Sequence, residues 1–114
     1  MGQWSLNLIV VPFSANKPLP RTALEPVCGA LANVIRQRRA ASGLSLNGLA
    51  EMTSLSRQMI SFIETSRRIP TIDSVARISR ALGVPCSKLM WEAEFELQLR
   101  ETRGSSVAEA ENKL

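Results

Sequence analysis

SLNGLAEMTSLSRQMISFIE, the stretch from Ser45 to Glu64, predicts two short helices joined by a tight polar turn. In the first helix Leu46, Leu49 and Ala50 fall on one face, because side chains three and four positions apart are neighbours on a helix surface. Ser45 precedes this helix as an N-cap whose hydroxyl can accept a backbone N–H of the first turn. The small Ala50 allows the axes of the two helices to approach closely.

The second helix of this stretch has one apolar and one polar face. Ser56 is its predicted N-cap, and Met59, Ile60 and Ile63 share the apolar face. A helix this short is not stable alone in water because its nucleation is costly, so its apolar face must pack against neighbouring elements. The opposite face is thereby turned outward, and it carries Arg57, Gln58, Ser61, Phe62 and Thr65.

A longer helix is predicted before this stretch. It begins at Pro26, which is tolerated in a first turn, and extends to about Ser42, with Gly43 as a left-handed C-cap. Apolar residues recur along it at spacings of three and four, which indicates one buried stripe. The residues of this stripe are Val27, Leu31, Val34 and Ile35.

Another helix follows the loop TSRRIPT. Pro70 precedes Thr71, the predicted N-cap, and the helix extends over residues 72–82, where Gly83 ends it in the left-handed conformation. We expect Arg77 and Arg80 on its outer side. The expected inward residues are Ile72, Val75, Ile78, Ser79 and Leu82.

The last predicted helix begins near Cys86 and extends to about Arg103. Leu89, Ala93 and Leu97 form one apolar stripe, and Trp91, Phe95 and Leu99 form a second stripe beside it. Two stripes exceed what a surface helix needs for its own domain, so the second is a candidate dimer interface within residues 91–103. The alternative is that this helix only covers the core. Residues 104–114 have too few apolar side chains to dock, and a flexible tail is predicted there.

The composition limits the classes of function. The chain has 114 residues, 45% of them hydrophobic and 21% charged, which is typical of one soluble globular domain without room for a separate catalytic domain. No apolar run approaches the roughly 18 residues of a membrane helix, and the N-terminus lacks the pattern of a signal peptide. There is no histidine, which excludes His-based catalytic triads and most zinc sites. Cys28 and Cys86 indicate reduced thiols in a cytoplasmic protein.

Charge is distributed unevenly along the chain. Residues 29–85 contain eight arginines and three carboxylates, whereas residues 92–114 contain six glutamates and three basic residues. This asymmetry is expected if only the central helices face a polyanion. Residues 1–25 form an N-terminal extension with three alternatives: a strand that pairs with its copy in a dimer, an arm packed on the domain, or a disordered segment.

Taken together, these residues resemble the Cro and phage-repressor type of helix-turn-helix domain, the xenobiotic-response-element class of regulators. The resemblance covers about residues 34–89, within a predicted domain of residues 26–90. It implies an all-α, five-helix, lambda-repressor-like fold. Its ordered signposts are Arg39, Leu49-Ala50, Leu55-Ser56, Ile60, Ile63, Glu64, Pro70, Leu82-Gly83-Val84 and Leu89.

The resemblance also implies roles for particular residues. The second helix of the opening stretch would enter the major groove of double-stranded DNA and present Ser56, Arg57, Gln58, Ser61 and Phe62. Arg57 could bond to guanine and Gln58 to adenine, while the Phe62 ring could lie against a thymine methyl group. Phosphates would be contacted by Arg67, Arg68 and the helix start at Ser45 and Asn47. Arg39 and Glu64 would form a structural ion pair.

The chain departs from the family at three positions. Leu46 stands where many members have a phosphate-contacting glutamine, and Ser54 and Ser66 stand where glycines are usual. A non-glycine residue in the left-handed conformation costs on the order of 1 kcal/mol. The small polar residues at these turns are similar to those of restriction–modification controller proteins.

Two functions follow from this reading. The first is a dimeric transcriptional regulator, a repressor or activator that needs no metal or cofactor. The second is a protein-interaction module of the antitoxin or anti-repressor type, for which Leu46 and an exposed Phe62 are the supporting features. An enzyme is not expected, because there is no glycine-rich phosphate loop, and Glu92, Glu94 and Glu96 alternate around a helix without converging.

Overall fold

The computed structural model of the protein describes residues 18 and 24–113, and these residues contain five helices and no strand. The helices are α2 (Pro26–Ala41), α3 (Leu46–Thr53), α4 (Arg57–Glu64), α5 (Ile72–Leu82) and α6 (Cys86–Lys113). The predicted all-α fold is therefore confirmed. The extension 1–25 lies almost entirely outside the described residues, so its three alternatives stay predictions.

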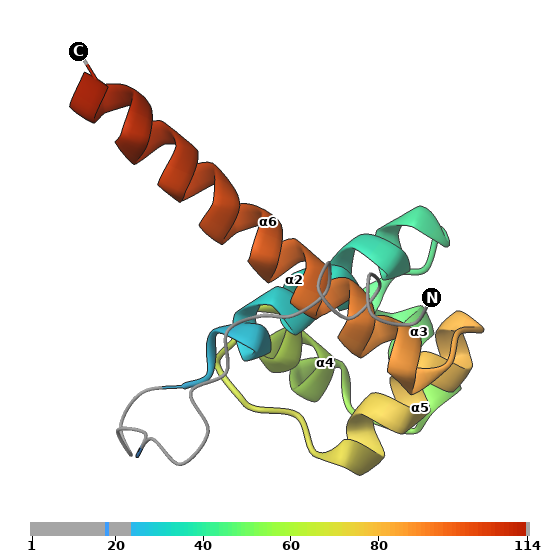
Figure 1. Ribbon diagram of the computed structural model, residues 1–114. Helices are drawn as coiled ribbons and strands as arrows, with labels where there is room; N and C mark the ends of the chain where they lie inside the picture. The colour runs from blue at the N-terminus through green and yellow to red at the C-terminus, as the bar shows by residue number, and fades with distance from the viewer. Residues whose placement is uncertain (1–17, 19–23, 114) are drawn as a thin grey trace, which may run out of the picture.

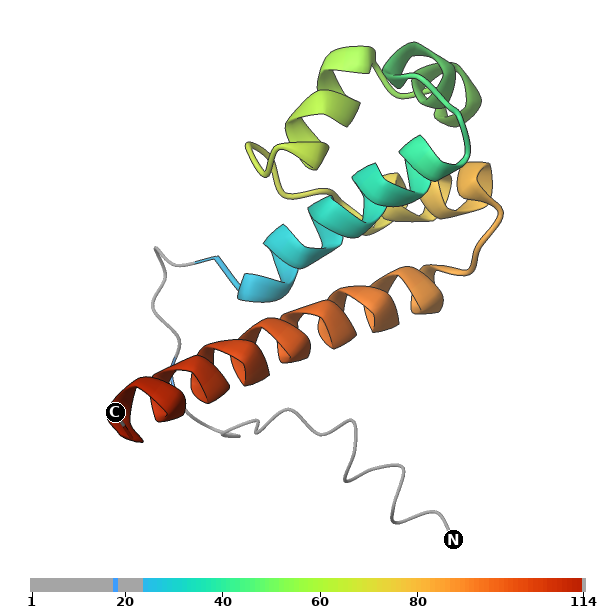
Figure 2. The same cartoon turned by 90° about the horizontal axis from the view of Figure 1, so that it is seen from above.

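Helix α2 occupies the centre of the arrangement. It packs along α6 on one side and contacts α4 on the other, and it also contacts α5, which in turn contacts α6 (Figures 1 and 2). Seen from above, α4 and α6 lie on opposite sides of α2 (Figure 2). A surface on the outer side of α4 and a surface on the outer side of α6 can therefore serve separate partners.

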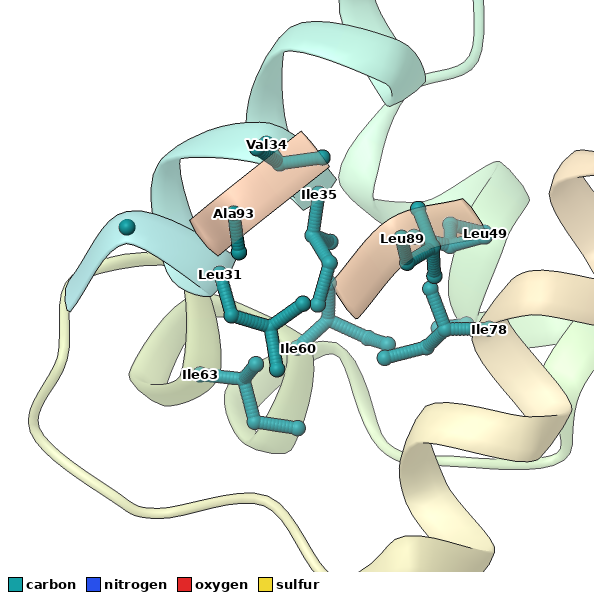
Figure 3. Packing of buried hydrophobic residues seen from close by; sticks show 11 residues of the cluster. Leu31, Val34, Ile35, Leu49, Ile60, Ile63, Ile78, Leu89 and Ala93 are labelled. Atoms are coloured by element: carbon teal, nitrogen blue, oxygen red, sulfur yellow. The ribbon is translucent and has the colours of Figure 1, made fainter. Parts of the chain in front are cut away.

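The core lies where these helices meet (Figure 3). Ile35, Ile60 and Leu89 are fully buried at the contact of α2, α4 and α6. Partly buried side chains such as Val27, Leu46 and Leu97 pack around this cluster. The predicted apolar stripes of α2, α3 and α4 thus face the core. The buried cluster consists of Ala30, Leu31, Val34, Ile35, Leu49, Ala50, Ile60, Ile63, Ile78, Leu89 and Ala93.

The predicted serine and threonine N-caps and the two predicted glycine C-caps are confirmed. The hydroxyl oxygens of Ser45, Ser56 and Thr71 accept hydrogen bonds from the backbone N–H three residues later, at 2.9, 3.0 and 3.0 Å. Gly43 and Gly83 have φ angles of +73° and +74°, which a glycine adopts without steric cost. Local capping chemistry therefore sets where α3, α4 and α5 start and where α2 and α5 stop.

One inward position was predicted wrongly. Ile72 is 88% exposed, whereas Ser74 is buried. Ile72 is the first residue of α5, at the end of the helix, where neighbouring helices do not cover it. The Ser74 hydroxyl is accommodated inside because it accepts a hydrogen bond of 3.0 Å from the Thr71 hydroxyl.

Helix α6 is longer than the sequence predicted. It continues to Lys113 through the segment 104–113, for which a flexible tail was expected. The stretch VAEAENK contains strong helix formers and no proline, so the backbone can stay helical beyond the last docked turn. The distal part of α6 accordingly extends away from the other helices (Figure 1). The predicted boundary between residues 26–90 and 91–103 falls inside this continuous helix.

Polar contacts that the sequence did not reveal join α2 to α6. Arg38 forms a two-pronged ion pair with Glu92, whose Nε–Oε1 distance is 2.7 Å. The Asn33 amide donates to Glu96, which also accepts a hydrogen bond of 2.9 Å from Arg100. Glu92 and Glu96 are one turn apart and both face α2, where each pairs with its own partners, whereas Glu94 is exposed.

The Arg38–Glu92 pair predicts a pH-dependent stability. Its hydrogen bond lowers the pKa of Glu92 below the ordinary value of 4.5. Because the folded-state pKa is the lower one, the stabilisation is complete above about pH 4.5 and is lost as the pH falls through the folded-state value. Both side chains are about a quarter exposed, so we expect less than about 1 kcal/mol.

Thermal unfolding of wild type and Glu92→Gln, followed from neutral pH downward, measures this effect. The difference between the two midpoints should shrink below pH 4.5. Glu94→Gln removes an exposed glutamate of the same helix and is the matched control. An unchanged difference at low pH would contradict the prediction.

Candidate nucleic-acid interface

The turn between α3 and α4 is fixed by Thr53 and Ser54. Thr53 is buried; its hydroxyl donates to the Leu49 carbonyl at 2.8 Å and accepts the Leu55 N–H at 3.3 Å. Ser54 adopts the left-handed conformation with φ +60°, at the position where the resemblance implies a glycine. The strain at Ser54 is tolerated because the residues on both sides are held by these bonds.

Arg77 ties the same turn to α5. Its Nη1 donates to the Thr53 carbonyl at 3.1 Å, and its Nε donates to Asp73 at 2.8 Å. The Thr53 carbonyl, at the C-terminal end of α3 where carbonyls lack partners within the helix, thereby gains a hydrogen-bond donor. The sequence placed Arg77 only on an outer face. The i, i+4 pairing with Asp73 was visible in the sequence, but the bond to Thr53 was not.

The rotation of α4 about its own axis is set by two isoleucines. Ile60 and Ile63 are 0% and 1% exposed and point into the core toward Leu31 of α2 (Figure 3). Because these side chains fix the inner face, the opposite face of α4 is turned to solvent. Arg57 and Gln58 are exposed on that face.

The far end of α4 is held by the expected ion pair. Arg39 donates through Nε and Nη2 to the two carboxylate oxygens of Glu64, at 2.6 and 2.9 Å. A third bond of 2.9 Å goes from Arg39 to the Leu44 carbonyl. The Arg39 and Glu64 side chains are 16% and 4% exposed, and the hydrogen bond to Glu64 raises the pKa of Arg39. This pair joins α2, the loop after it and the last residue of α4.

The predicted contact residues gather on neighbouring segments. Ser45 and Asn47 are exposed at the start of α3, Ser56 at the start of α4, and Arg67 and Arg68 in the loop after α4. Ser61 is half-buried on α4. Leu46 packs against the core, so the first residue of α3 does not replace the family's glutamine as a polar contact.

Phe62 differs from its prediction, because its side chain is half-buried and not exposed. Its ring lies 5.9 Å from the Arg68 guanidinium carbon. The alternative of a protein-interaction module thus loses one of the two features that supported it. No sequence pattern signals this ring contact, which depends on the path of the loop after α4.

The loop after α4 turns back over Phe62. Ser66 has a φ angle of +61°, at the second position where the resemblance implies a glycine. The N–H groups of Arg67 and Arg68 both donate to the Phe62 carbonyl, at 2.8 and 3.2 Å. Two arginines are therefore placed directly beside the C-terminal end of α4.

The second apolar stripe of α6 is uncovered. Trp91, Phe95 and Leu99 are 50%, 48% and 41% exposed, while Leu89 and Ala93 on the other face are fully buried. The Trp91 and Phe95 rings stack with their centroids 5.1 Å apart. Covering the core therefore does not use this stripe. Among the described helices, α6 included, none is long and apolar enough to cross a membrane.

Two short helices joined by a fixed turn, the second presenting a polar face to solvent, define a helix-turn-helix protein. Residues 35–89 match the helix-turn-helix family, and this part of the chain belongs to it as a domain of the Cro/C1 type.

Two regulators of this class are similar to the chain, one in sequence and one in fold. The HTH-type transcriptional regulator SutR of Escherichia coli (strain K12) is 34% identical over 64 residues, which are 56% of this chain. The chain spans only 36% of the length of SutR. The clp gene regulator ClgR from Corynebacterium glutamicum has a structure that superposes with a TM-score of 0.70 at 25% identity, over 76% of this chain and 93% of that one.

A restriction–modification controller protein is also similar. The structure of wild-type C.Esp1396I superposes with a TM-score of 0.59 at 27% identity, over 68% of this chain and 99% of that chain. The similarity to controller proteins noted at the turn residues thus extends to the fold.

Proposed function

We propose that the chain is a DNA-binding transcriptional regulator whose helix α4 enters the major groove. The observation that carries this proposal is the outward face of α4, where Arg57 and Gln58 are exposed while Ile60 and Ile63 lock the opposite face into the core. The helix-turn-helix match and the regulators similar to this chain support it. The protein would act in the cytoplasm, blocking or recruiting polymerase at an operator.

Base recognition is assigned to Arg57, Gln58 and Ser61. The Arg57 guanidinium can donate two bonds to O6 and N7 of guanine, and the Gln58 amide can bond to N6 and N7 of adenine. Ser61, one turn further along α4, can reach a base edge or a phosphate. These two bidentate contacts are where specificity would reside, since each is worth about 1–3 kcal/mol of discrimination.

Phosphate contacts would supply most of the affinity. Arg67 and Arg68 follow α4, and Ser45 and Asn47 begin α3, so these groups flank the groove-reading helix on two segments. Arginine side chains and helix N-terminal N–H groups are common phosphate donors. Binding through several phosphates predicts a steep loss of affinity with rising salt.

Arg57→Ala is expected to relax base preference at one position of each half-site. The loss should be about 1–3 kcal/mol per half-site, or roughly 5- to 150-fold, because one bidentate pair is removed. The measurement starts from sites selected from random duplex DNA and compares the affinity of wild type and variant for the selected site and single-base mismatches at fixed salt.

Arg103→Ala is the matched control, because it removes the same charge from an exposed position on α6, on the other side of α2. It should leave the base preference unchanged. The proposal fails if wild type shows no salt-dependent binding, or if Arg57→Ala weakens all sequences equally.

We further propose that the protein is a homodimer formed through α6. The stripe of Trp91, Phe95 and Leu99 offers stacked aromatic anchors opposite the core face of α6. A two-fold pairing of this surface places α4 of each subunit away from the contact, since α2 separates α4 from α6 (Figure 2). Such a dimer would read a roughly palindromic site with half-sites about one helical turn, ~34–36 Å, apart.

Phe95→Glu is expected to convert this dimer to a monomer, because it places a charge at the centre of an apolar contact. Light scattering coupled to gel filtration would report the mass. Ala76→Glu adds the same charge at an exposed position on α5, away from the stripe on α6, and should leave the dimer intact. A monomeric wild type, or a dimeric Phe95→Glu variant, would exclude this interface.

A further inference from the structure

Phe62 stands among the groove-facing residues of α4, yet its ring contacts a neighbouring side chain. The Arg68 guanidinium carbon lies 5.9 Å from the ring centroid, within the range of a cation–π contact. Resting on the proposed DNA-binding function, we propose that Phe62 is a positioning residue: its ring holds the Arg68 guanidinium ready to bind a backbone phosphate, and it does not read a base.

The backbone reinforces this placement. The carbonyl of Phe62 accepts the N–H of Arg68 at 3.2 Å and the N–H of Arg67 at 2.8 Å. The left-handed Ser66 makes the sharp turn that brings the chain back over α4. The base of the Arg68 side chain and its charged tip are therefore both tied to the same residue, one by the main chain and one by the ring.

The burial of Phe62 argues against the base-reading role. The ring is half-buried, so part of its surface is already used against the protein. Arg68 lies over the ring face, so a thymine methyl group would have to compete with the guanidinium for it. A phosphate does not compete with the guanidinium for the ring face, because it can accept hydrogen bonds from the guanidinium while the cation stays stacked on the ring.

The ring contact would raise DNA affinity by holding the Arg68 side chain in place before the phosphate binds. An arginine side chain has many rotamers, and binding a phosphate normally requires most of that freedom to be lost. A guanidinium already held by a ring has less freedom to lose. An exposed cation–π contact corresponds to an effect of about two- to five-fold on affinity per half-site.

Arg67 provides the matched comparison. It is exposed, it is adjacent in the chain, and its N–H donates to the same carbonyl, yet the ring contact formed in the described part of the chain involves Arg68. If Phe62 acts through Arg68, the two substitutions Arg68→Ala and Phe62→Leu should overlap in effect. Arg67→Ala and Phe62→Leu should be additive.

The experiment measures how tightly the 114-residue chain binds a selected duplex, its single-base mismatches and random duplex at fixed salt. Phe62→Leu, which keeps an apolar side chain but removes the ring, should weaken all these duplexes by about the same two- to five-fold per half-site and leave the base preference unchanged. Phe62→Tyr, which restores the ring, should recover wild-type affinity. In the Arg68→Ala background, Phe62→Leu should have no further effect.

A measurement on the protein without DNA separates the positioning role of Phe62 from the proposed DNA-binding function. The side-chain proton resonances of Arg68 should be shifted by the ring current in wild type and in Phe62→Tyr, and should return to ordinary values in Phe62→Leu. Wild type that fails to bind DNA overturns the proposed function. The positioning role is overturned if wild type binds but Phe62→Leu changes preference at one base position, if its effect persists in Arg68→Ala, or if the Arg68 resonances do not move.

Discussion

Glu64→Ala is expected to destabilise the protein by about 3–5 kcal/mol, because it removes one partner of a buried ion pair and leaves the other charge behind. The Arg39 and Glu64 side chains are 16% and 4% exposed, and two hydrogen bonds join them at 2.6 and 2.9 Å. After the substitution the Arg39 guanidinium keeps only its bond to the Leu44 carbonyl. Urea-induced unfolding of wild type and variant measures the loss.

Two further variants separate the loss of a contact from the cost of an unpaired charge. The double substitution Arg39→Met with Glu64→Leu removes both charges and keeps apolar volume, so it should be far less destabilising than Glu64→Ala alone. Asp73→Ala breaks a pair whose side chains are 72% and 46% exposed, and it should cost less than about 1 kcal/mol. A Glu64→Ala effect as small as that of Asp73→Ala would contradict the burial of the pair.

The same pair connects stability with the proposed function. Glu64 is the last residue of α4, and Arg39 links it to α2 and to the loop before α3. Removal of this link frees the C-terminal end of α4, beside which Arg67 and Arg68 leave the helix. DNA affinity should therefore fall in Glu64→Ala even under conditions in which the variant is fully folded.

Much of the fold could be predicted because its determinants are local. The N-caps Ser45, Ser56 and Thr71 act on N–H groups only three residues away, so the sequence placed the helix starts correctly. The left-handed positions Ser54 and Ser66 were indicated by the resemblance to the family, because two turns require that conformation whichever residue occupies it.

What could not be predicted depends on residues far apart in the chain. Arg38 reaches Glu92 across 54 positions, and Arg77 reaches the Thr53 carbonyl across 24. A helical periodicity says which side of a helix is apolar, but not where a neighbouring helix ends. This is why Ile72, on the apolar side of α5, was expected inside and is exposed.

The candidate site shows the same division. The outward direction of Arg57 and Gln58 follows from the spacing of Ile60 and Ile63, which is local information. The half-burial of Phe62 depends on a loop that returns over the helix, and the sequence alone gave no sign of it.

Ile60→Ala is expected to cost about 2–5 kcal/mol, because it opens a cavity at the centre of the core. Ile60 is 0% exposed and belongs to the cluster that joins α4 to α2, α5 and α6. An eight-residue helix has little stability of its own, so the loss falls on the docking of α4 itself. The measurement is again the free energy of unfolding in urea, with hydrogen exchange of α4 amides to locate the change.

Ile60→Val should cost about 0.5–1.5 kcal/mol, because it removes one methylene from the same site. Ile72→Ala truncates an isoleucine that is 88% exposed, and its effect should lie within about 0.5 kcal/mol. The order Ile60→Ala, Ile60→Val, Ile72→Ala is what the burial of these two residues requires. If Ile72→Ala were as destabilising as Ile60→Ala, Ile72 would have to be buried, and α5 would be rotated relative to the structure described above. The packing of the core could then no longer be used to infer which face of α4 presents Arg57.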